Sequence, residues 1–177
     1  MSSHLVLTVI GVDKPGLVDR LATTIATAGG SWLGSRMARL SGQFAGIVEV
    51  QVSNERAAEL AHALGALDGL SVMVTPSGEV AIGAAPRSAR LAFVGQDRPG
   101  LVQAVSRVLA ENLVNVEELE TRTYLAAMSG TQVFEAEATL SLPAEVDVAA
   151  LRERLEAVAR DVFVDIHIAE AGDTTAR

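Results

Sequence analysis

Apolar residues follow two kinds of spacing along the chain, one typical of strands and one typical of helices. In residues 45–53, Val48, Val50 and Val52 alternate with polar neighbours, which indicates a strand with one buried face. In residues 16–28 the apolar side chains recur every three or four positions and form a single helical stripe. The two patterns therefore divide the chain into predicted strands and helices.

The predicted elements occur in the same order in both halves of the chain. The first half gives strand 4–12, helix 16–28, strand 31–40, strand 45–53, helix 55–65 (capped by Ser53 or Asn54) and strand 70–76. The second half gives strand 90–96, helix 100–111, strand 114–124, strand 131–141, helix 147–160 and strand 162–169, which opens on Val162. Residues 77–88 are the predicted linker, and 171–177 a predicted disordered tail.

This order is that of the ferredoxin-like, or split βαβ, fold. The sequence therefore predicts an α+β protein with two βαββαβ modules in tandem, at residues 4–76 and 89–170. Each module is expected to form a four-stranded antiparallel sheet with two helices on one face. Because this fold hosts many unrelated activities, it does not by itself indicate a function.

A six-residue motif links the first strand to the first helix in each half. It reads Asp13-Lys14-Pro15-Gly16-Leu17-Val18 in the first half and Asp97-Arg98-Pro99-Gly100-Leu101-Val102 in the second, an offset of 84 residues. Five of the six positions are identical, and the sixth exchanges one cation for another. We therefore look for the function of the protein in this repeated turn.

The turn combines groups that suit a free amino acid. A helix N-terminus has unpaired N–H groups and a partial positive charge, both of which favour a carboxylate. Gly16 and Gly100 lack the Cβ atom that would hold a ligand away from the backbone, and Asp13 and Asp97 offer an acceptor for an ammonium group. The alternative is that each Asp only caps the helix that follows it.

An Asp-x-Pro-Gly-Leu turn within this element order resembles the ACT domain, a small regulatory module that often binds amino acids. Two such modules without a catalytic domain resemble the glycine cleavage system transcriptional repressor family. The resemblance covers roughly residues 4–169. It implies that the protein senses an amino acid, with glycine expected, and acts on a transcriptional activator through protein contact.

The resemblance also implies composite sites, in which a turn is completed by the start of the second strand of a neighbouring module. An Asn is typical there, and this chain has Asn115-Val116 in the second half but Ser31-Trp32 in the first. We therefore expect turn 13–17 with Asn115-Val116 to form the better site, and turn 97–101 with Ser31-Trp32 the poorer one. Alternatively, Asn115 is only a turn residue after the preceding helix.

Composition narrows the possible functions. The net charge of −8 argues against direct binding of nucleic acid, and the absence of Cys excludes disulfides, thiol catalysis and most structural zinc sites. There is no Gly-x-Ser-x-Gly elbow and no phosphate-binding loop. We expect no enzymatic activity, cofactor, metal or membrane span, and a cytoplasmic, homodimeric protein. The alternative function is a ligand-free interaction module.

Overall fold

The computed structural model describes residues 2–77, 87–127, 129–162 and 164–170. The chain divides into two compact units, Met1–Ala81 and Ile82–Arg177, which we call the N-terminal and C-terminal units. Most of the predicted linker at 77–88 and all of the predicted tail lie outside the described residues. Each unit is therefore described by itself.

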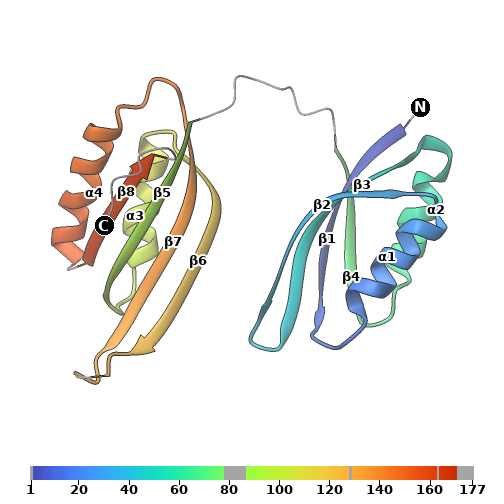
Figure 1. Ribbon diagram of the computed structural model, residues 1–177, viewed down its shortest axis with the longest axis horizontal. Helices are drawn as coiled ribbons and strands as arrows, with labels where there is room; N and C mark the ends of the chain where they lie inside the picture. The colour runs from blue at the N-terminus through green and yellow to red at the C-terminus, as the bar shows by residue number, and fades with distance from the viewer. Residues whose placement is uncertain (1, 78–86, 128, 163, 171–177) are drawn as a thin grey trace. The chain divides into compact units, whose positions relative to one another are not determined.

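The N-terminal unit is a four-stranded antiparallel sheet with two helices. Its elements are β1 (Ser2–Val12), α1 (Leu17–Thr27), β2 (Ser31–Leu40), β3 (Gln43–Ser53), α2 (Asn54–Gly65) and β4 (Ser71–Ser77). The strands lie in the order β2-β3-β1-β4, and each neighbouring pair is antiparallel. Figure 1 shows α1 and α2 on the same face of this sheet, which leaves the other face open.

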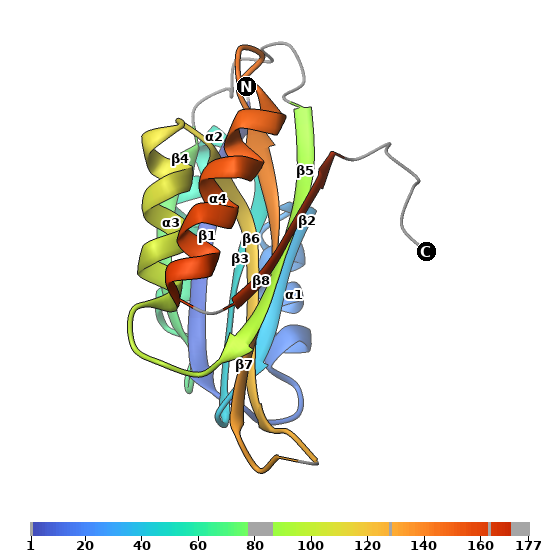
Figure 2. The same cartoon turned by 90° about the vertical axis from the view of Figure 1, so that its left-hand side faces the viewer.

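The C-terminal unit repeats this arrangement. Its elements are β5 (Arg87–Gln96), α3 (Leu101–Glu111), β6 (Asn115–Leu125), β7 (Gln132–Leu142), α4 (Val148–Val162) and β8 (Val164–Glu170). The strand order β6-β7-β5-β8 matches that of the N-terminal unit strand for strand. Figure 2 shows α3 and α4 side by side over one face of the sheet. The predicted tandem ferredoxin-like fold is therefore confirmed.

Each core lies between the sheet and its helices. In the N-terminal unit, Leu5, Leu7 and Val9 alternate along β1 and pack against Leu21 and Ile25 of α1. All five side chains are buried. Burying one such side chain contributes about 1.5–3 kcal/mol to stability. The strand and helix periodicities therefore direct these apolar side chains into one layer between the sheet and its helices.

The core of the C-terminal unit has the same origin. Leu91 and Phe93 of β5 pack against Val105 and Leu109 of α3. The ring of Phe93 also stacks on that of Phe134, with centroids 5.8 Å apart. The two units are thus built around separate cores of the same design.

Two turns of the N-terminal unit contain residues with positive φ. Ser41 and Gly42 both have positive φ, 49° and 78°, which suits the tight turn of the β2–β3 hairpin. Gly29 ends α1 with φ 68°, and the N–H of Gly30 donates to the carbonyl of Ile25 at 2.9 Å. This bond is the one that closes a Schellman helix end.

Two sequence-based expectations need correction. Ser53 occupies the N-cap position of α2 but makes no capping hydrogen bond, while the Asn54 side chain accepts one from Ser3. Val162, predicted to open the last strand, is the last residue of α4. It lies seven residues after Leu155 and so continues the buried stripe of the helix. An apolar residue at a helix–strand boundary fits the apolar pattern of either element, so the pattern alone does not decide between them.

A substitution at Gly11 tests how closely the α2–β4 loop packs on β1. A Cβ atom at Gly11 would clash with the main-chain carbonyl of Gly69, whereas one at Gly34 meets nothing within 4 Å. We expect Gly11→Ala to lower the free energy of unfolding by about 1–3 kcal/mol. The matched change Gly34→Ala should alter it by less than about 0.5 kcal/mol. Urea denaturation of both variants checks this, and equal effects would contradict the packing.

Candidate functional site

The two repeated turns have the same backbone conformation. Gly16 and Gly100 immediately precede α1 and α3, with φ of 88° and 93°. L-residues rarely adopt this region, so the backbone itself requires glycine, in addition to the ligand access expected from the sequence. A Cβ atom at either position would meet no heavy atom within 4 Å, so both glycines face open space.

The helices that follow the turns have no side-chain cap. The first backbone bonds run from the N–H of Arg20 to the Gly16 carbonyl at 3.1 Å, and from Ala104 to Gly100 at 2.9 Å. The N–H groups before these residues therefore lack an intrahelical partner. The N-cap positions belong to Gly16 and Gly100, not to the aspartates, and the described hydrogen bonds include none from either helix start to an Asp13 or Asp97 side chain.

The two aspartates differ in their surroundings. Each turn is fixed by a backbone bond, from Asp13 to the Gly42 carbonyl and from Asp97 to the Gln132 carbonyl, both 2.9 Å. The Asp13 carboxylate also pairs with Arg39 of β2, at 2.7 Å between Oδ2 and Nε. Asp97 is exposed, and its side chain has no ion pair with a described residue. An ammonium group bound by Asp13 would therefore share that carboxylate with Arg39, whereas one bound by Asp97 would not compete with an ion pair to a described residue.

The sequence did not indicate that Arg39 pairs with Asp13. The hairpin that follows this residue lies beside Asp13, as the Asp13–Gly42 bond shows, and only the folded sheet makes this proximity visible. The position 84 residues later is Thr123, which cannot form the same ion pair. The two turns therefore share a backbone but not a charge environment.

Lys14 and Arg20 connect the first turn to the α2–β4 loop. Lys14 folds over Gly69, so that its Nζ would lie 2.7 Å from a Cβ atom there. Arg20 donates from one terminal nitrogen to the Asp68 carbonyl at 2.8 Å, and its other terminal nitrogen is enclosed without a partner in the described structure. In the C-terminal unit Arg98 and Ala104 occupy the equivalent positions, so the Arg20 contact is specific to the first module.

Other predicted turn residues contribute through their backbone. The side chains of Leu17 and Leu101 are each 3% exposed and belong to the cores, so only their main-chain groups can reach a ligand. Pro15 and Pro99 are exposed and lead into the left-handed glycines. The side-chain chemistry of the turns therefore comes from the residues before the prolines.

The predicted completing residues open equivalent strands. Ser31-Trp32 begins β2 and Asn115-Val116 begins β6, and each pair is followed at once by a β-bulge. Asn115 pairs with Ser141 in the sheet, so the alternative in which it is a turn residue is wrong; Leu113, with φ 57°, has that role. The proposed pairing of turn 13–17 with Asn115-Val116 joins separate units and stays a prediction.

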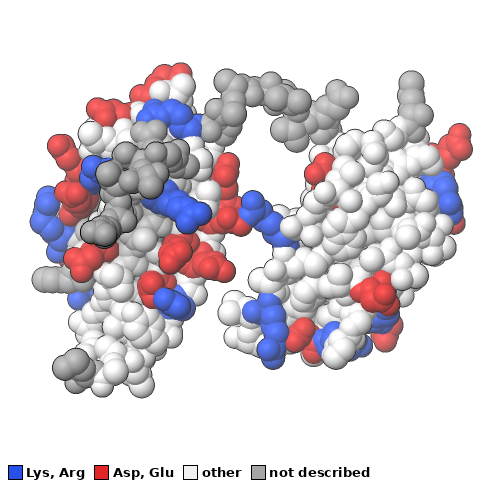
Figure 3. Space-filling model, viewed as in Figure 1, with Lys and Arg blue, Asp and Glu red and all other residues white. Residues whose placement is uncertain are grey.

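The open face of the C-terminal sheet is strongly charged. Glu120 lies directly opposite Glu137, and Arg122 forms an ion pair with Glu135 at 2.8 Å. The hydrogen bond from Arg122 to Glu135 raises the pKa of the guanidinium above its usual value. Figure 3 shows acidic side chains gathered over this unit. Within the described ranges, however, no three acidic or His side chains are placed to hold a metal ion.

Comparison with known families and structures agrees with the geometry of the turns and sheets. The family model for the ACT domain matches residues 3–73. The match covers all six elements of the N-terminal unit in whole or in part. The C-terminal unit repeats the same elements and strand order, so the chain has two modules with the ACT-type, ferredoxin-like fold in tandem.

Two solved structures match nearly the whole chain. An unknown protein from Galdieria sulphuraria is 28% identical, with a TM-score of 0.84 over 97% of this chain and 99% of that one. A candidate glycine cleavage system transcriptional repressor is 18% identical, with a TM-score of 0.71 over 97% and 98% of the two chains. No curated protein matches the chain.

The ACT domain is a regulatory type of module, and its match covers the N-terminal unit. In the part of the chain that the structure describes, no helix is long and apolar enough to cross a membrane. The repeated turns are features that the two modules share.

The left-handed glycines can be tested through stability. We expect Gly16→Ala and Gly100→Ala each to lower the free energy of unfolding by about 1–2 kcal/mol, because an L-residue is strained at positive φ. Gly16→Asn should lower the free energy of unfolding by less, since Asn adopts positive φ more readily than Ala. The control is Gly65→Ala in α2, where the Cβ atom is unobstructed and φ is not positive; it should be neutral or stabilising. Urea denaturation measures all four.

Proposed function

We propose that the protein is a sensor of a free amino acid, with glycine as the expected ligand, and that the repeated turns bind it. The observation that carries this proposal is the pair of uncapped helix N-termini, each preceded by a glycine that faces open space. A helix start of this kind provides N–H donors and a favourable potential for a carboxylate. Its duplication in both modules supports a shared role.

The ligand's ammonium group would be bound by the aspartate of the turn. Asp97 offers an exposed carboxylate, and Asp13 one that already pairs with Arg39. Both ends of an amino acid thus find a complementary group within one short segment. Glycine suits this arrangement because it carries both charges and no side chain.

We further propose that ligand occupancy acts on a transcriptional activator by protein contact. The fold similarity to the candidate glycine cleavage system transcriptional repressor supports this assignment. The net charge of −8 favours an accessory protein over one that grips DNA itself. Binding would regulate the partner by favouring one arrangement of the modules over another, to the extent that the ligand binds the two arrangements differently.

A thermal-shift panel of the common amino acids at about 10 mM tests the proposal. A ligand present at 100 times its Kd adds about 2.7 kcal/mol of stability. In a chain of this size each kcal/mol moves the Tm by about 2–4 °C, so binding of glycine will be evident. Asp13→Ala and Asp97→Ala should each reduce the shift because they remove the ammonium acceptor.

Asp19→Ala is the matched control for these variants. It removes an exposed carboxylate from the first turn of α1 without touching the repeated motif, and should leave the glycine shift unchanged. We also expect Asn115→Ala to weaken glycine binding more than the equivalent Ser31→Ala. A panel in which no amino acid shifts the Tm of the folded protein would refute the sensor function.

The second candidate function, a ligand-free interaction module, is favoured by the open sheet face of the N-terminal unit. Ile10, Ile47 and Met73 point away from the helices and are 48%, 51% and 62% exposed. Thr8 of β1 pairs with both Ile47 and Met73, so the two side chains lie in one row across the sheet. Contiguous exposed apolar surface of this kind marks interaction sites.

We propose that this face forms the interface of a homodimer. A substitution that introduces one charged side chain on this face tests the proposal. Ile47→Glu should shift the protein from dimer to monomer in sedimentation at micromolar concentration, because a buried unpaired carboxylate opposes association. Ala26→Glu, exposed on α1 over the opposite side of the sheet, should leave the mass unchanged. A wild-type chain that is already monomeric under these conditions would contradict the proposal.

A further inference from the structure

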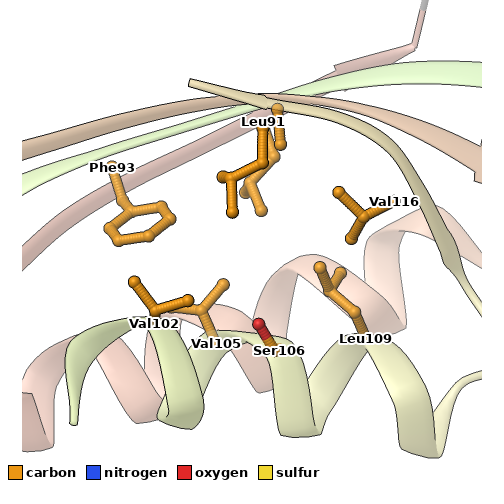
Figure 4. Close-up of a pocket in the computed structure, with 9 residues that line it drawn as sticks. Leu91, Phe93, Val102, Val105, Ser106, Leu109 and Val116 are labelled. Atoms are coloured by element: carbon orange, nitrogen blue, oxygen red, sulfur yellow. The ribbon is translucent and has the colours of Figure 1, made fainter. Parts of the chain in front are cut away.

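The C-terminal unit contains a small apolar cavity between α3 and the sheet. Figure 4 shows Leu91 of β5 on the sheet side and Val105 of α3 on the helix side. Ala138 of β7 also lines the cavity. The volume is about 20 Å³, which is room for roughly one water-sized group.

The cavity opens toward solvent along the edge of the sheet. Three of its lining side chains, Val102 of α3 and Val116 and Leu119 of β6, are 37%, 36% and 47% exposed. Val102 follows the repeated turn at 97–101 directly in the chain, and lies in the first turn of α3. One end of the cavity is therefore next to the unpaired N–H groups at the start of this helix, while Val116 lies beside Leu109, toward the end of the helix (Figure 4).

Two of the lining positions carry larger side chains in the N-terminal unit. Val116 corresponds to Trp32 through the 84-residue offset, and Ala138 corresponds to Val48 through the sheet register. Trp32 packs against the N-terminal core and Val48 is buried within it. At these two positions the N-terminal module therefore has less room between its sheet and its first helix than the C-terminal module.

The lining determines what the cavity can accept. The hydroxyl of Ser106 is its single polar side chain. A buried water needs two to four hydrogen-bond partners, so an apolar group is a better occupant. A methyl group fits the volume, and the half-exposed valine and leucine side chains at the mouth have room to admit a slightly larger alkyl group.

We propose that this cavity receives the alkyl side chain of an amino acid bound at turn 97–101, so that the C-terminal module prefers a small aliphatic amino acid such as alanine. The inference rests on the proposed function of the turns. The N-terminal module, with Trp32 at the equivalent position, keeps a preference for glycine. The two modules would then respond to different amino acids.

Calorimetric titration of the full chain with glycine and with L-alanine tests the proposal. We expect L-alanine to bind the C-terminal module about tenfold more tightly than glycine, the usual gain for one carbon in an apolar pocket. Ala138→Val and Val116→Trp give the C-terminal module the residues of the N-terminal one. Each should abolish the tenfold preference, and Ala138→Val, at a position outside the proposed composite sites, should also leave glycine binding intact.

The outcomes separate this inference from the proposed function. Ala138→Val adds only two methyl groups, so it remains informative if Val116→Trp fails to fold. Equal affinities for glycine and L-alanine in the wild-type chain, or a preference that survives Ala138→Val, would overturn the inference and leave the sensor intact. Absence of binding by both amino acids would overturn the inference and the glycine assignment, and the full thermal-shift panel then decides on the sensor function.

Discussion

Each module depends on a glycine held at positive φ between its first strand and first helix. Gly16 and Gly100 redirect the chain there, so that the buried leucine that follows each of them, Leu17 or Leu101, enters a core. The same conformation leaves the helix start without a side-chain cap and with open space in front of it. The positive φ of this glycine therefore matters both for the fold and for the anion-binding potential of the turn. The motif can thus be the same in both modules although many of the residues around it differ.

The duplicated modules share this backbone but have diverged in the side chains around it. Asp13 is paired with Arg39, whereas Asp97 stands without an ion pair to a described residue. Trp32 packs against the N-terminal core at the position where the C-terminal unit has the smaller Val116. The differences lie in charge pairing and in packing volume, and the strand order is the same in both modules.

Sequence periodicity predicted the fold well because burial alone determines the element order and the sheet faces. It failed where two patterns coincide, as at Val162, whose apolar side chain suits both the end of α4 and the start of a strand. For the candidate site, the sequence showed the repeated turn motif but not the pairing of Arg39 with Asp13. That contact depends on where the β2–β3 hairpin lies after folding, and no spacing along the chain encodes it.

The contacts around Gly69 offer a physical route from the first turn to the rest of its module. Lys14 lies over this glycine, Arg20 binds the neighbouring Asp68 carbonyl, and Gly11 of β1 packs closely against the loop from the other side. The loop leads directly into β4, which carries Met73 on the open sheet face. A carboxylate at the turn would attract Lys14, the motif's cation, and so compete with its position over the loop. Coupling through packed, contiguous groups of this kind is how occupancy of a small site can alter a distant surface.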